Sequence, residues 1–323
     1  MGLKFVMLPP QNELYRRWGQ RLAKSLPDYL IAVAENEQQA MDEIVDADAA
    51  FGTVTLPLLQ KATRLRWIQS PLAAPPAGYY YPELVDHKLV VTNFREIFND
   101  HIGAHVMSLV LAFSRGLHRY IPLQLQRKWQ PAPDRVKNTV YLPEASMLIV
   151  GVGGIGAETA RMAATFGLRV IGVDKRRKDI PEGMSALHPA EALDELLPEA
   201  DFVVLTVPDT PVTKGYFNRE RFRRMKPTAF FINIGRGKTT RLDDLVAALQ
   251  AGEIAGAGLD VFEQEPLPAD HPLWVMPGVI LTPHVAAHGP YLDDRRFEIL
   301  QDNCRHFAAG EPFRNVVDKK LWY

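Results

Sequence analysis

The feature that most constrains the fold is a glycine-rich turn between two apolar segments near the middle of the chain. The apolar run Met147–Val150 leads directly into Gly151-Val152-Gly153-Gly154-Ile155-Gly156. A second apolar run, Val170–Val173, follows after a helix-length segment and ends at Asp174. A strand, a G-x-G-x-x-G turn, a helix and a strand ending in an acid are together typical of dinucleotide-binding units.

Each glycine of this turn has an expected task. Gly151 would permit the tight turn, Gly153 would let the backbone approach a pyrophosphate, and Gly156 would let the helix pack closely on the strand. The helix N-terminus offers unpaired N–H groups and a partial positive charge to phosphates. We therefore expect Gly154 and Ile155, in its first turn, to belong to the same cofactor site.

The composition is that of a globular protein of about two domains. Of its 323 residues, 47% are apolar and 23% are charged. The formal net charge of −1 provides no basic field for nucleic acid or an anionic membrane, so neither partner is expected. The single cysteine, Cys304, excludes an internal disulfide and is best interpreted as a buried structural thiol. Met1–Val6 resembles a first strand rather than a signal peptide, and we expect a cytoplasmic location.

Short apolar runs alternate with amphipathic segments along the first hundred residues. The expected strands there are Leu3–Leu8, Tyr29–Val33, Ala47–Phe51, Arg66–Gln69 and Leu89–Val91, and the expected helices are Glu13–Ser25, Gln38–Val45 and Pro57–Lys61. In the second half we expect strands at Arg169–Asp174, Phe202–Val207, Ala229–Ile234, Ala257–Leu259 and Val279–Leu281. Such alternation predicts parallel sheets with crossover helices, the α/β class.

The architecture we predict is a doubly wound, Rossmann-type cofactor domain inserted into a smaller, flavodoxin-like α/β domain. The cofactor domain would span residues 101–289, and the substrate domain would combine residues 1–100 with residues 290–323. Its last part would be a helix over Pro290–Ala309. A discontinuous domain joined to the other by two crossings provides a natural hinge.

Three further helical segments carry detailed expectations. His101–Tyr120 is one long apolar-periodic segment, followed by an irregular arm at Trp129–Pro133. The helix after the glycine turn should stop at Gly167 and bury one face, comprising Ile155, Thr159, Met162, Ala163 and Phe166. Another helix should begin at Thr240 as N-cap, end at Gly252 and bury Leu242, Leu245, Val246 and Leu249.

The end of the second strand of the cofactor domain bears on the choice of cofactor. Asp174 is placed to accept a hydrogen bond from a ribose 2′-hydroxyl and to repel a 2′-phosphate, which favours NAD. Lys175, Arg176 and Arg177 follow at once, and this basic cluster would hold the 2′-phosphate of NADP if Asp174 turned away. The cluster is otherwise a solvated turn. NAD is the expected cofactor, with NADP as the alternative.

Three strands of the cofactor domain end in reactive side chains. Arg236 follows Phe230–Ile234, Glu265 follows Gly258–Leu259, and His284 follows Leu281. In an open parallel sheet, ligands bind outside the carboxyl ends of the strands. Alone, each residue has an ordinary explanation as a surface ion pair, a loop acid or a turn histidine. Together behind a dinucleotide fingerprint, they predict a catalytic site.

The chemistry of 2-keto acid reduction needs these three residue types. A guanidinium binds the carboxylate and polarises the carbonyl, which suits Arg236. A histidine delivers a proton to the developing alkoxide near neutral pH, which suits His284. A carboxylate orients the imidazole, which suits Glu265. No metal ligand is expected.

These motifs, with Thr206–Thr213, resemble those of the NAD-dependent D-2-hydroxyacid dehydrogenase family, which includes glyoxylate/hydroxypyruvate reductases. The resemblance is dense over Ser146–Pro290 and looser outside it. It implies that Arg236 binds substrate and that His284, held by Glu265, is the acid/base. It implies a homodimer built largely through the cofactor domain, in which the arm Pro122–Leu142 either joins the contact or packs as a surface loop on its own subunit. The implied cofactor contacts beyond the glycine turn and Asp174 are Val207, Pro208, Thr213, Ile234, Gly235, Arg236, Asp260, His284 and Ala286.

The substrate loop of the first domain departs from the family pattern. Where the family usually has Ser-x-x-Ala-Gly-Val-Asp, this chain has Ser70–Tyr81, with Ala74 in place of the glycine and prolines at Pro75 and Pro76. Proline has no N–H, so the amides expected to bind a substrate carboxylate are those of Leu72, Ala73 and Ala74. The tyrosines Tyr79–Tyr81 either accommodate a larger substrate or pack the start of a helix.

We therefore expect an NAD-dependent reductase of a small 2-keto acid, with Arg236 and His284 binding the substrate. Glu265 argues against formate oxidation, because the formate-oxidising relatives have Gln there. Two alternatives stay open. One is a NAD-sensing binding protein like the corepressors that resemble this family, and the other is a related dehydrogenase acting on a different small anion such as phosphite.

Overall fold

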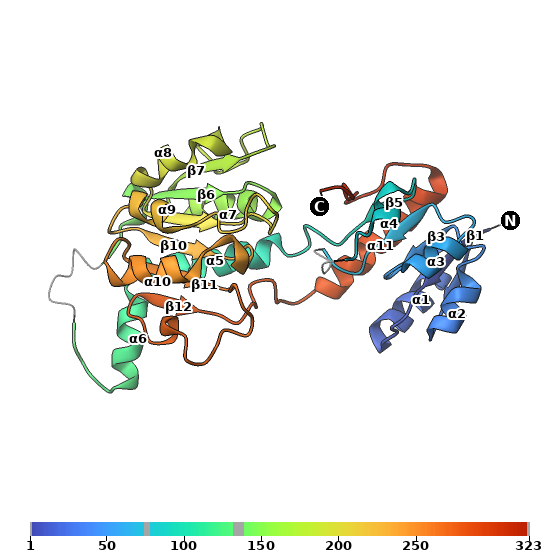
Figure 1. Cartoon of the computed structure of the whole chain (residues 1–323), viewed down its shortest axis with the longest axis horizontal. Helices are drawn as coiled ribbons and strands as arrows, with labels where there is room; N and C mark the ends of the chain where they lie inside the picture. Colours follow the sequence, from blue (N-terminus) through green and yellow to red (C-terminus); the bar gives the residue numbers. More distant parts are fainter. Residues whose placement is uncertain (1, 74–77, 132–138, 322–323) are drawn as a thin grey trace. The chain divides into compact units, whose positions relative to one another are not determined.

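The alternation of strands and helices gives two separate parallel sheets (Figure 1). The computed structural model describes residues 2–73, 78–131 and 139–321. They form two units, one of Met1–Ile97 with Pro290–Tyr323 and the other of Phe98–Gly289. The first segment of the first unit ends at Ile97, and helix α5 of the second unit begins at Asn99.

The first unit contains a parallel sheet with the strand order β2-β1-β3-β4-β5, the flavodoxin-like order that was expected. Its strands are β1 (Leu3–Met7), β2 (Tyr29–Val33), β3 (Ala49–Phe51), β4 (Trp67–Gln69) and β5 (Val90–Thr92). Its helices are α1 (Glu13–Ser25), α2 (Glu37–Glu43), α3 (Leu56–Lys61), α4 (Pro82–Asp86) and α11 (Leu292–Ala309).

Helix α11, from the end of the chain, completes the core of this first unit. Its Phe297 packs against Trp18 of α1, and its Phe307 packs against Trp67 of β4. Cys304 is fully buried on the same helix, and burial raises the pKa of its thiol. The cysteine is therefore a buried packing residue, as expected.

The second unit contains a parallel sheet with the strand order β12-β11-β10-β9-β6-β7-β8. The strands are β6 (Ser146–Val150), β7 (Arg169–Asp174), β8 (Ala186–Pro189), β9 (Phe202–Leu205), β10 (Phe230–Asn233), β11 (Gly256–Leu259) and β12 (Val279–Leu281). The helices are α5 (Asn99–Ser114), α6 (Leu117–Leu125), α7 (Gly154–Thr165), α8 (Leu193–Leu196), α9 (Arg219–Arg224) and α10 (Leu242–Gln250). The order reverses between β6 and β9, where ligands bind in open sheets of this kind.

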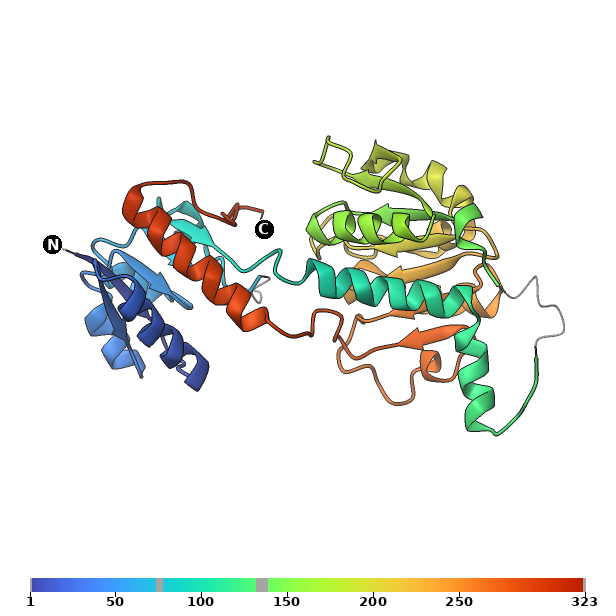
Figure 2. The same ribbon diagram turned by 180° about the vertical axis from the view of Figure 1, so that it is seen from behind.

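Both faces of this second sheet are buried, which makes it doubly wound. Along β6, Met147 and Ile149 contribute to one apolar cluster, while Leu148 and Val150 contribute to another. Helices α5 and α7 lie side by side on the face of the first cluster (Figure 2). Because both faces are covered, the strands are continuous apolar runs rather than alternating ones.

Three local expectations were wrong. The segment His101–Tyr120 is two helices rather than one, because Gly116 adopts a left-handed φ of 71° between α5 and α6. Phe166 is 43% exposed, since it lies beyond the last turn of α7. Thr240 is not the N-cap of α10: its hydroxyl accepts from Asn233 Nδ2, and the Leu242 N–H donates to Glu263 instead.

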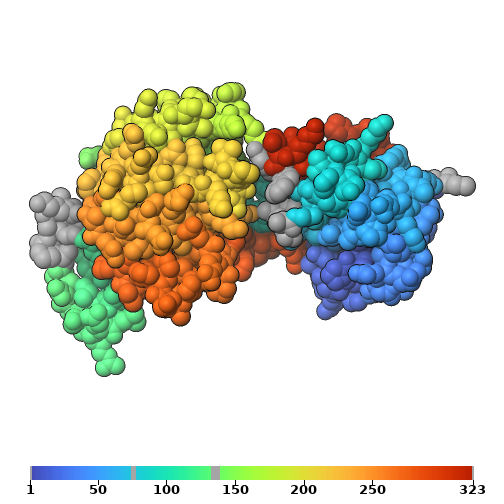
Figure 3. Space-filling model, viewed as in Figure 1, coloured from blue at the N-terminus to red at the C-terminus, as the bar shows by residue number. Residues whose placement is uncertain are grey.

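Helix α6 stands out from the body of its unit (Figure 3).

Among the described helices, none combines the length and the apolar character that a membrane span requires.

Candidate active site

The glycine turn after β6 has the geometry that a dinucleotide needs. Gly151 has a left-handed φ of 93°, so the turn requires glycine there. A Cβ at Gly156 would lie 2.4 Å from the Gly151 carbonyl oxygen, so α7 packs closely because this residue is glycine. A Cβ at Gly153 would meet no described atom within 4 Å, which leaves open space at the N-terminus of α7. This cradle, with Gly154 and Ile155 in the first helical turn, fits a pyrophosphate.

The carboxylate of Asp174 is fixed at the end of β7 by three backbone N–H groups. Oδ2 accepts from Val152 N at 2.7 Å, and Oδ1 accepts from Arg176 N and Arg177 N at 2.7 and 2.8 Å. Burial alone would raise the pKa of Asp174, but these three donors outweigh it and hold the pKa below the ordinary value. Asp174 is thus an ionised group beside the glycine turn.

Three basic residues follow Asp174. Arg177 is engaged, since it pairs with Asp179 at 2.7 Å and donates to the Val152 carbonyl. Lys175 and Arg176 have exposed side chains. The turn therefore presents one fixed negative charge and two exposed positive charges.

Arg236 lies in a loop that the buried side chain of Asn233, at the end of β10, holds in shape. Asn233 Oδ1 accepts from Gly235 N at 3.0 Å, and its Nδ2 donates to the Arg236 carbonyl at 3.2 Å. A Cβ at Gly237 would lie 1.8 Å from the carbonyl oxygen of Phe262, so only glycine permits this approach. The loop is thereby packed directly on the segment that carries Glu265. Asn233 was not predicted as a site residue, although a polar residue ending a buried strand was the available signal.

The guanidinium of Arg236 is largely enclosed and faces acidic groups. Burial lowers its pKa, and the charges of Glu265 and Asp209 oppose that effect. Its Nη1 donates to the Gly235 carbonyl at 2.6 Å, which leaves donors of the guanidinium fork for a ligand.

Glu265 and His284 form a direct pair. His284 Nδ1 lies 2.7 Å from Glu265 Oε2, and Glu265 Oε1 accepts from Phe262 N at 2.9 Å. Because an ionised carboxylate only accepts, Nδ1 carries the proton of this hydrogen bond, and the contact with Glu265 leaves Nε2 unused. The histidine side chain is 48% exposed, so this second nitrogen is open to a reactant.

The loop that carries His284 is tied to Asp260, which is 1% exposed. Asp260 Oδ1 accepts from Val285 N and Oδ2 accepts from Ala286 N, both at 2.9 Å. Thr282 Oγ1 donates to Oδ1 at 2.7 Å. Asp260 and Ala286 were both expected to contact the cofactor, and here they contact each other.

The remaining expected cofactor residues line neighbouring strand ends of the same unit. Val207 contacts the glycine turn, where a Cβ at Gly151 would lie 2.8 Å from its side chain. The Thr213 hydroxyl donates to the Pro208 carbonyl at 2.6 Å, which closes the loop after β9 on itself. Ile234 is buried and its N–H donates to the Leu205 carbonyl at 3.3 Å.

The expected substrate loop lies in the first unit. Leu72 N contacts Ser70 Oγ at 3.4 Å, and the Ala73 carbonyl accepts from Asn93 Nδ2 at 3.1 Å. Ala74 lies outside the described residues, as do Pro75 and Pro76.

The tyrosines that follow the loop pack against the first unit. The Tyr79 hydroxyl donates to the Gly52 carbonyl at 3.2 Å, and the Tyr81 hydroxyl donates to the Val54 carbonyl at 3.0 Å. Both rings therefore anchor the loop to the segment after β3, in agreement with the packing interpretation.

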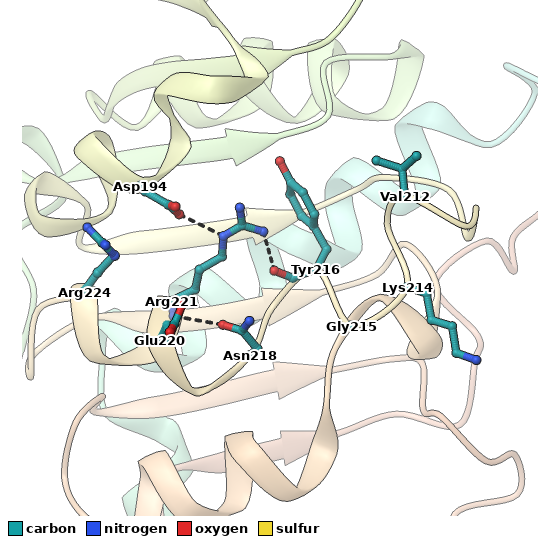
Figure 4. A pocket seen from close by; sticks show the side chains of 9 residues that line it. All are labelled: Asp194, Val212, Lys214, Gly215, Tyr216, Asn218, Glu220, Arg221 and Arg224. Atoms are coloured by element: carbon teal, nitrogen blue, oxygen red, sulfur yellow. Dashed lines mark hydrogen bonds and ion pairs between the residues drawn. The ribbon is translucent and has the colours of Figure 1, made fainter.

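A surface pocket of the second unit contains none of the predicted site residues (Figure 4). Its central side chain, Arg221, pairs with Asp194 at 2.8 Å and lies over the Tyr216 ring, 4.0 Å from its centroid. Because Arg221 is satisfied by its neighbours, the arrangement stabilises the loop after β9.

Comparison with known proteins identifies the family. Residues 107–286 match the family model described as D-isomer specific 2-hydroxyacid dehydrogenase, NAD binding domain. The chain belongs to the D-isomer-specific 2-hydroxyacid dehydrogenases. It is 33% identical over 287 residues to a glyoxylate reductase of Korarchaeum cryptofilum, covering 87% of this chain and 86% of the relative. It is 32% identical to glyoxylate/hydroxypyruvate reductase B of Escherichia fergusonii, covering 93% and 98%.

Solved structures of the family share the whole fold. A D-isomer specific 2-hydroxyacid dehydrogenase of Xanthobacter autotrophicus Py2, in complex with NADPH and MES, matches with a TM-score of 0.83 and 27% identity over 100% of both chains. A family member from Aeromonas salmonicida matches with a TM-score of 0.76 and 34% identity over 99% and 100%. This D-2-hydroxyacid dehydrogenase is therefore an NAD(P)-dependent oxidoreductase that transfers hydride between the cofactor and a 2-keto/2-hydroxy acid pair.

Proposed function

We propose that this enzyme reduces a small 2-keto acid such as glyoxylate or hydroxypyruvate, with Arg236, Glu265 and His284 as its catalytic residues. The observation that carries the proposal is the 2.7 Å pair of His284 Nδ1 and Glu265 Oε2, formed beside the enclosed Arg236. The named reductases among the relatives support this substrate class.

Arg236 supplies binding and polarisation. Its guanidinium presents paired N–H groups that match a carboxylate, and a positive charge beside a ketone oxygen stabilises the charge that develops there. Burial strengthens both effects, because the charge is less screened than it would be in bulk water. The charges of Glu265 and Asp209 oppose the lowering of the Arg236 pKa that burial causes.

His284 supplies the proton. Glu265 accepts from Nδ1 and fixes the ring, so that a proton on Nε2 is donated to the developing alkoxide. The carboxylate is in turn held by the Phe262 N–H. When bound, the reduced nicotinamide supplies the hydride. Hydride and proton together convert the ketone to the alcohol.

The cofactor would be held by the glycine turn and the helix α7 N-terminus, with its adenosine ribose near Asp174. Three backbone donors occupy the Asp174 carboxylate, and a fourth acceptor position suits a ribose 2′-hydroxyl. We therefore propose NADH as the preferred cofactor. Lys175 and Arg176 are the groups that would accommodate the additional phosphate of NADPH.

Initial rates with glyoxylate, hydroxypyruvate, pyruvate and longer 2-keto acids, each with NADH and NADPH, test the reaction. We expect turnover with at least one small keto acid, and His284→Ala and Arg236→Ala should each lower kcat/KM at least ~100-fold while thermal unfolding is unchanged. Absence of turnover with the whole panel, combined with NADH-dependent capture of a protein partner, would instead favour the binding-protein alternative.

A second copy of this chain is the partner we propose for helix α6. None of the described residues of α6 is buried. Its apolar side chains Ile121 and Leu125 are 52% and 80% exposed. Trp129, just beyond the helix, is 99% exposed. Apolar side chains in such a cluster typically mark an interface. The resemblance to the family implies a homodimer built through the cofactor domain, and we propose that this surface is its interface in the cytoplasm.

Sedimentation velocity tests the dimer. Ile121→Asp combined with Leu125→Asp should convert a dimeric wild-type protein to a monomer, because each charge would be buried without a partner. Leu30→Asp, at a 62% exposed position of β2 in the first unit, is the matched control and should stay dimeric. A monomeric wild-type protein would contradict the proposal.

A further inference from the structure

His284 adopts a backbone conformation that histidine rarely occupies. Its φ is 55°, in the left-handed region, where a residue with a Cβ is strained. Its N–H donates to the Thr282 carbonyl at 3.0 Å, which makes a tight turn around Pro283. Such a conformation persists only where the surroundings impose it.

The carboxylate of Asp260 holds the chain on both sides of His284. On the N-terminal side it accepts from the Thr282 hydroxyl at 2.7 Å. On the C-terminal side it accepts from the amides of Val285 and Ala286 at 2.9 Å. The Asp260 side chain is 1% exposed, so its position is set by packing and these bonds rather than by solvent.

His105, on the α5 face of the sheet, extends this arrangement. Its Nε2 lies 3.0 Å from Thr282 Oγ1 and 3.9 Å from Asp260 Oδ1. The Thr282 hydroxyl has one proton, which it donates to the carboxylate, so it can only accept from the imidazole. His105 Nε2 therefore carries a hydrogen, and the donors run in one direction from His105 through Thr282 to Asp260.

We propose that His105 and Thr282 are positioning residues for the reaction, acting through Asp260 to hold His284 in its left-handed turn. Glu265 fixes the imidazole ring, whereas this second chain of hydrogen bonds fixes the backbone from which the ring projects. The inference rests on His284 being the proton donor. A proton donor displaced by about 1 Å loses on the order of 100-fold in rate, so the relay has a kinetic consequence beyond stability.

The Thr282→Val variant tests the relay, because it removes the hydroxyl and keeps the shape. We expect kcat to fall ~10- to 100-fold, while the dissociation constant for NADH, measured by fluorescence titration of the full chain, changes less than ~2-fold. Thr282→Ser, which keeps the hydroxyl, should restore kcat to within ~3-fold. His105→Leu should act in the same direction as Thr282→Val, and His105→Gln, which keeps a donor, should recover part of the loss.

Thr159→Val is the matched control. Thr159 is buried, and its hydroxyl donates to the Ile155 carbonyl within α7. It should leave kcat unchanged. Retention of kcat by Thr282→Val at an unchanged unfolding temperature would overturn the proposal, and so would a loss that Thr282→Ser fails to rescue. If His284→Ala remains active, the assigned role of His284 fails instead, so the two failures are distinguishable.

Discussion

Two aspartates at the same edge of the same sheet have opposite surroundings. Asp174 ends β7, Asp260 follows β11, and each carboxylate accepts three hydrogen bonds from its own chain. Asp174 is partly exposed beside Lys175 and Arg176, whereas Asp260 is buried beneath the turn of His284. The same residue type in the same topological position is therefore partly exposed in one place, where we propose that it meets the cofactor ribose, and organises its own chain in the other.

This difference shows how burial divides the tasks of a strand-end acid. A partly exposed carboxylate with a free acceptor position can select between ligands, because water and ligand compete for it. Where a carboxylate is buried among its donors, the loss of any one of these hydrogen bonds costs the folded protein much free energy. The two aspartates should consequently respond to the same substitutions with effects of different kind and size.

The largest effect is expected for Asp260→Ala. It leaves the Thr282 hydroxyl and two backbone N–H groups without their acceptor in a buried site, which should lower the free energy of unfolding by about 2–4 kcal/mol. It should also lower kcat at least ~100-fold, since the His284 turn is released. Urea unfolding and steady-state rates measure the two losses. A stability loss equal to that of Asp174→Ala would remove the distinction between the two sites.

A smaller and different effect is expected for Asp174→Ala. The backbone donors of its turn can be solvated when the carboxylate is lost, so the free energy of unfolding should fall by only about 1 kcal/mol. The ratio of kcat/KM for NADPH to that for NADH should rise ~10-fold or more, because the charge that repels a 2′-phosphate is gone. An unchanged ratio would show that Asp174 does not face the ribose.

The charge of Asp174 should make its contribution pH-dependent. Its pKa is lowered in the folded protein, so it stabilises the fold above the ordinary aspartate pKa and loses that contribution as pH falls through the folded value. The difference in unfolding free energy between wild type and Asp174→Asn should be constant near neutral pH. It should shrink below about pH 4. Urea titrations at several pH values test this, and a difference that grows on acidification would contradict it.

The smallest effect is expected for Lys175→Ala. An exposed side chain contributes little to the fold, so stability should be unchanged. KM for NADPH should rise ~3-fold, with little change for NADH. A larger rise in KM for NADH than for NADPH would show that this lysine contacts a part of the cofactor other than the 2′-phosphate.

Much of the fold followed from periodicity. Strands β2, β7 and β12 and helix α1 begin and end at the predicted residues, because continuous apolar runs and an Asn12 cap define them. The long helical segment was interpreted wrongly at Gly116, since a left-handed glycine between two apolar stretches leaves the 3.6-residue periodicity almost intact. The short helices α8 and α9 and the edge strand β8 carry too few apolar residues to show a period.

The candidate site was predictable where residue types suited to the reaction follow the carboxyl ends of strands. Arg236, Glu265 and His284 follow three strands of one sheet, and the structure pairs the last two. The residues that hold them were missed. Asn233 acts on the Arg236 carbonyl within its own loop, and only its place at the end of a buried strand pointed to it. His105 acts on Thr282, which lies far away in the sequence. The expected cofactor contact of Asp260 stays a prediction. Its hydrogen bonds to Thr282, Val285 and Ala286 were not predicted, because a local sequence does not show which partners a strand-end carboxylate takes.

The central claim is that Glu265 and His284 work as one proton-donating unit. A double-mutant cycle on kcat with the preferred keto acid tests it most directly, using Glu265→Ala, His284→Ala and the double variant. We expect each single change to lower kcat at least ~100-fold, and the double variant to be no slower than His284→Ala, because a carboxylate without its imidazole has nothing to orient. Losses that multiply in the double variant would show that the two residues act independently, and would contradict the account.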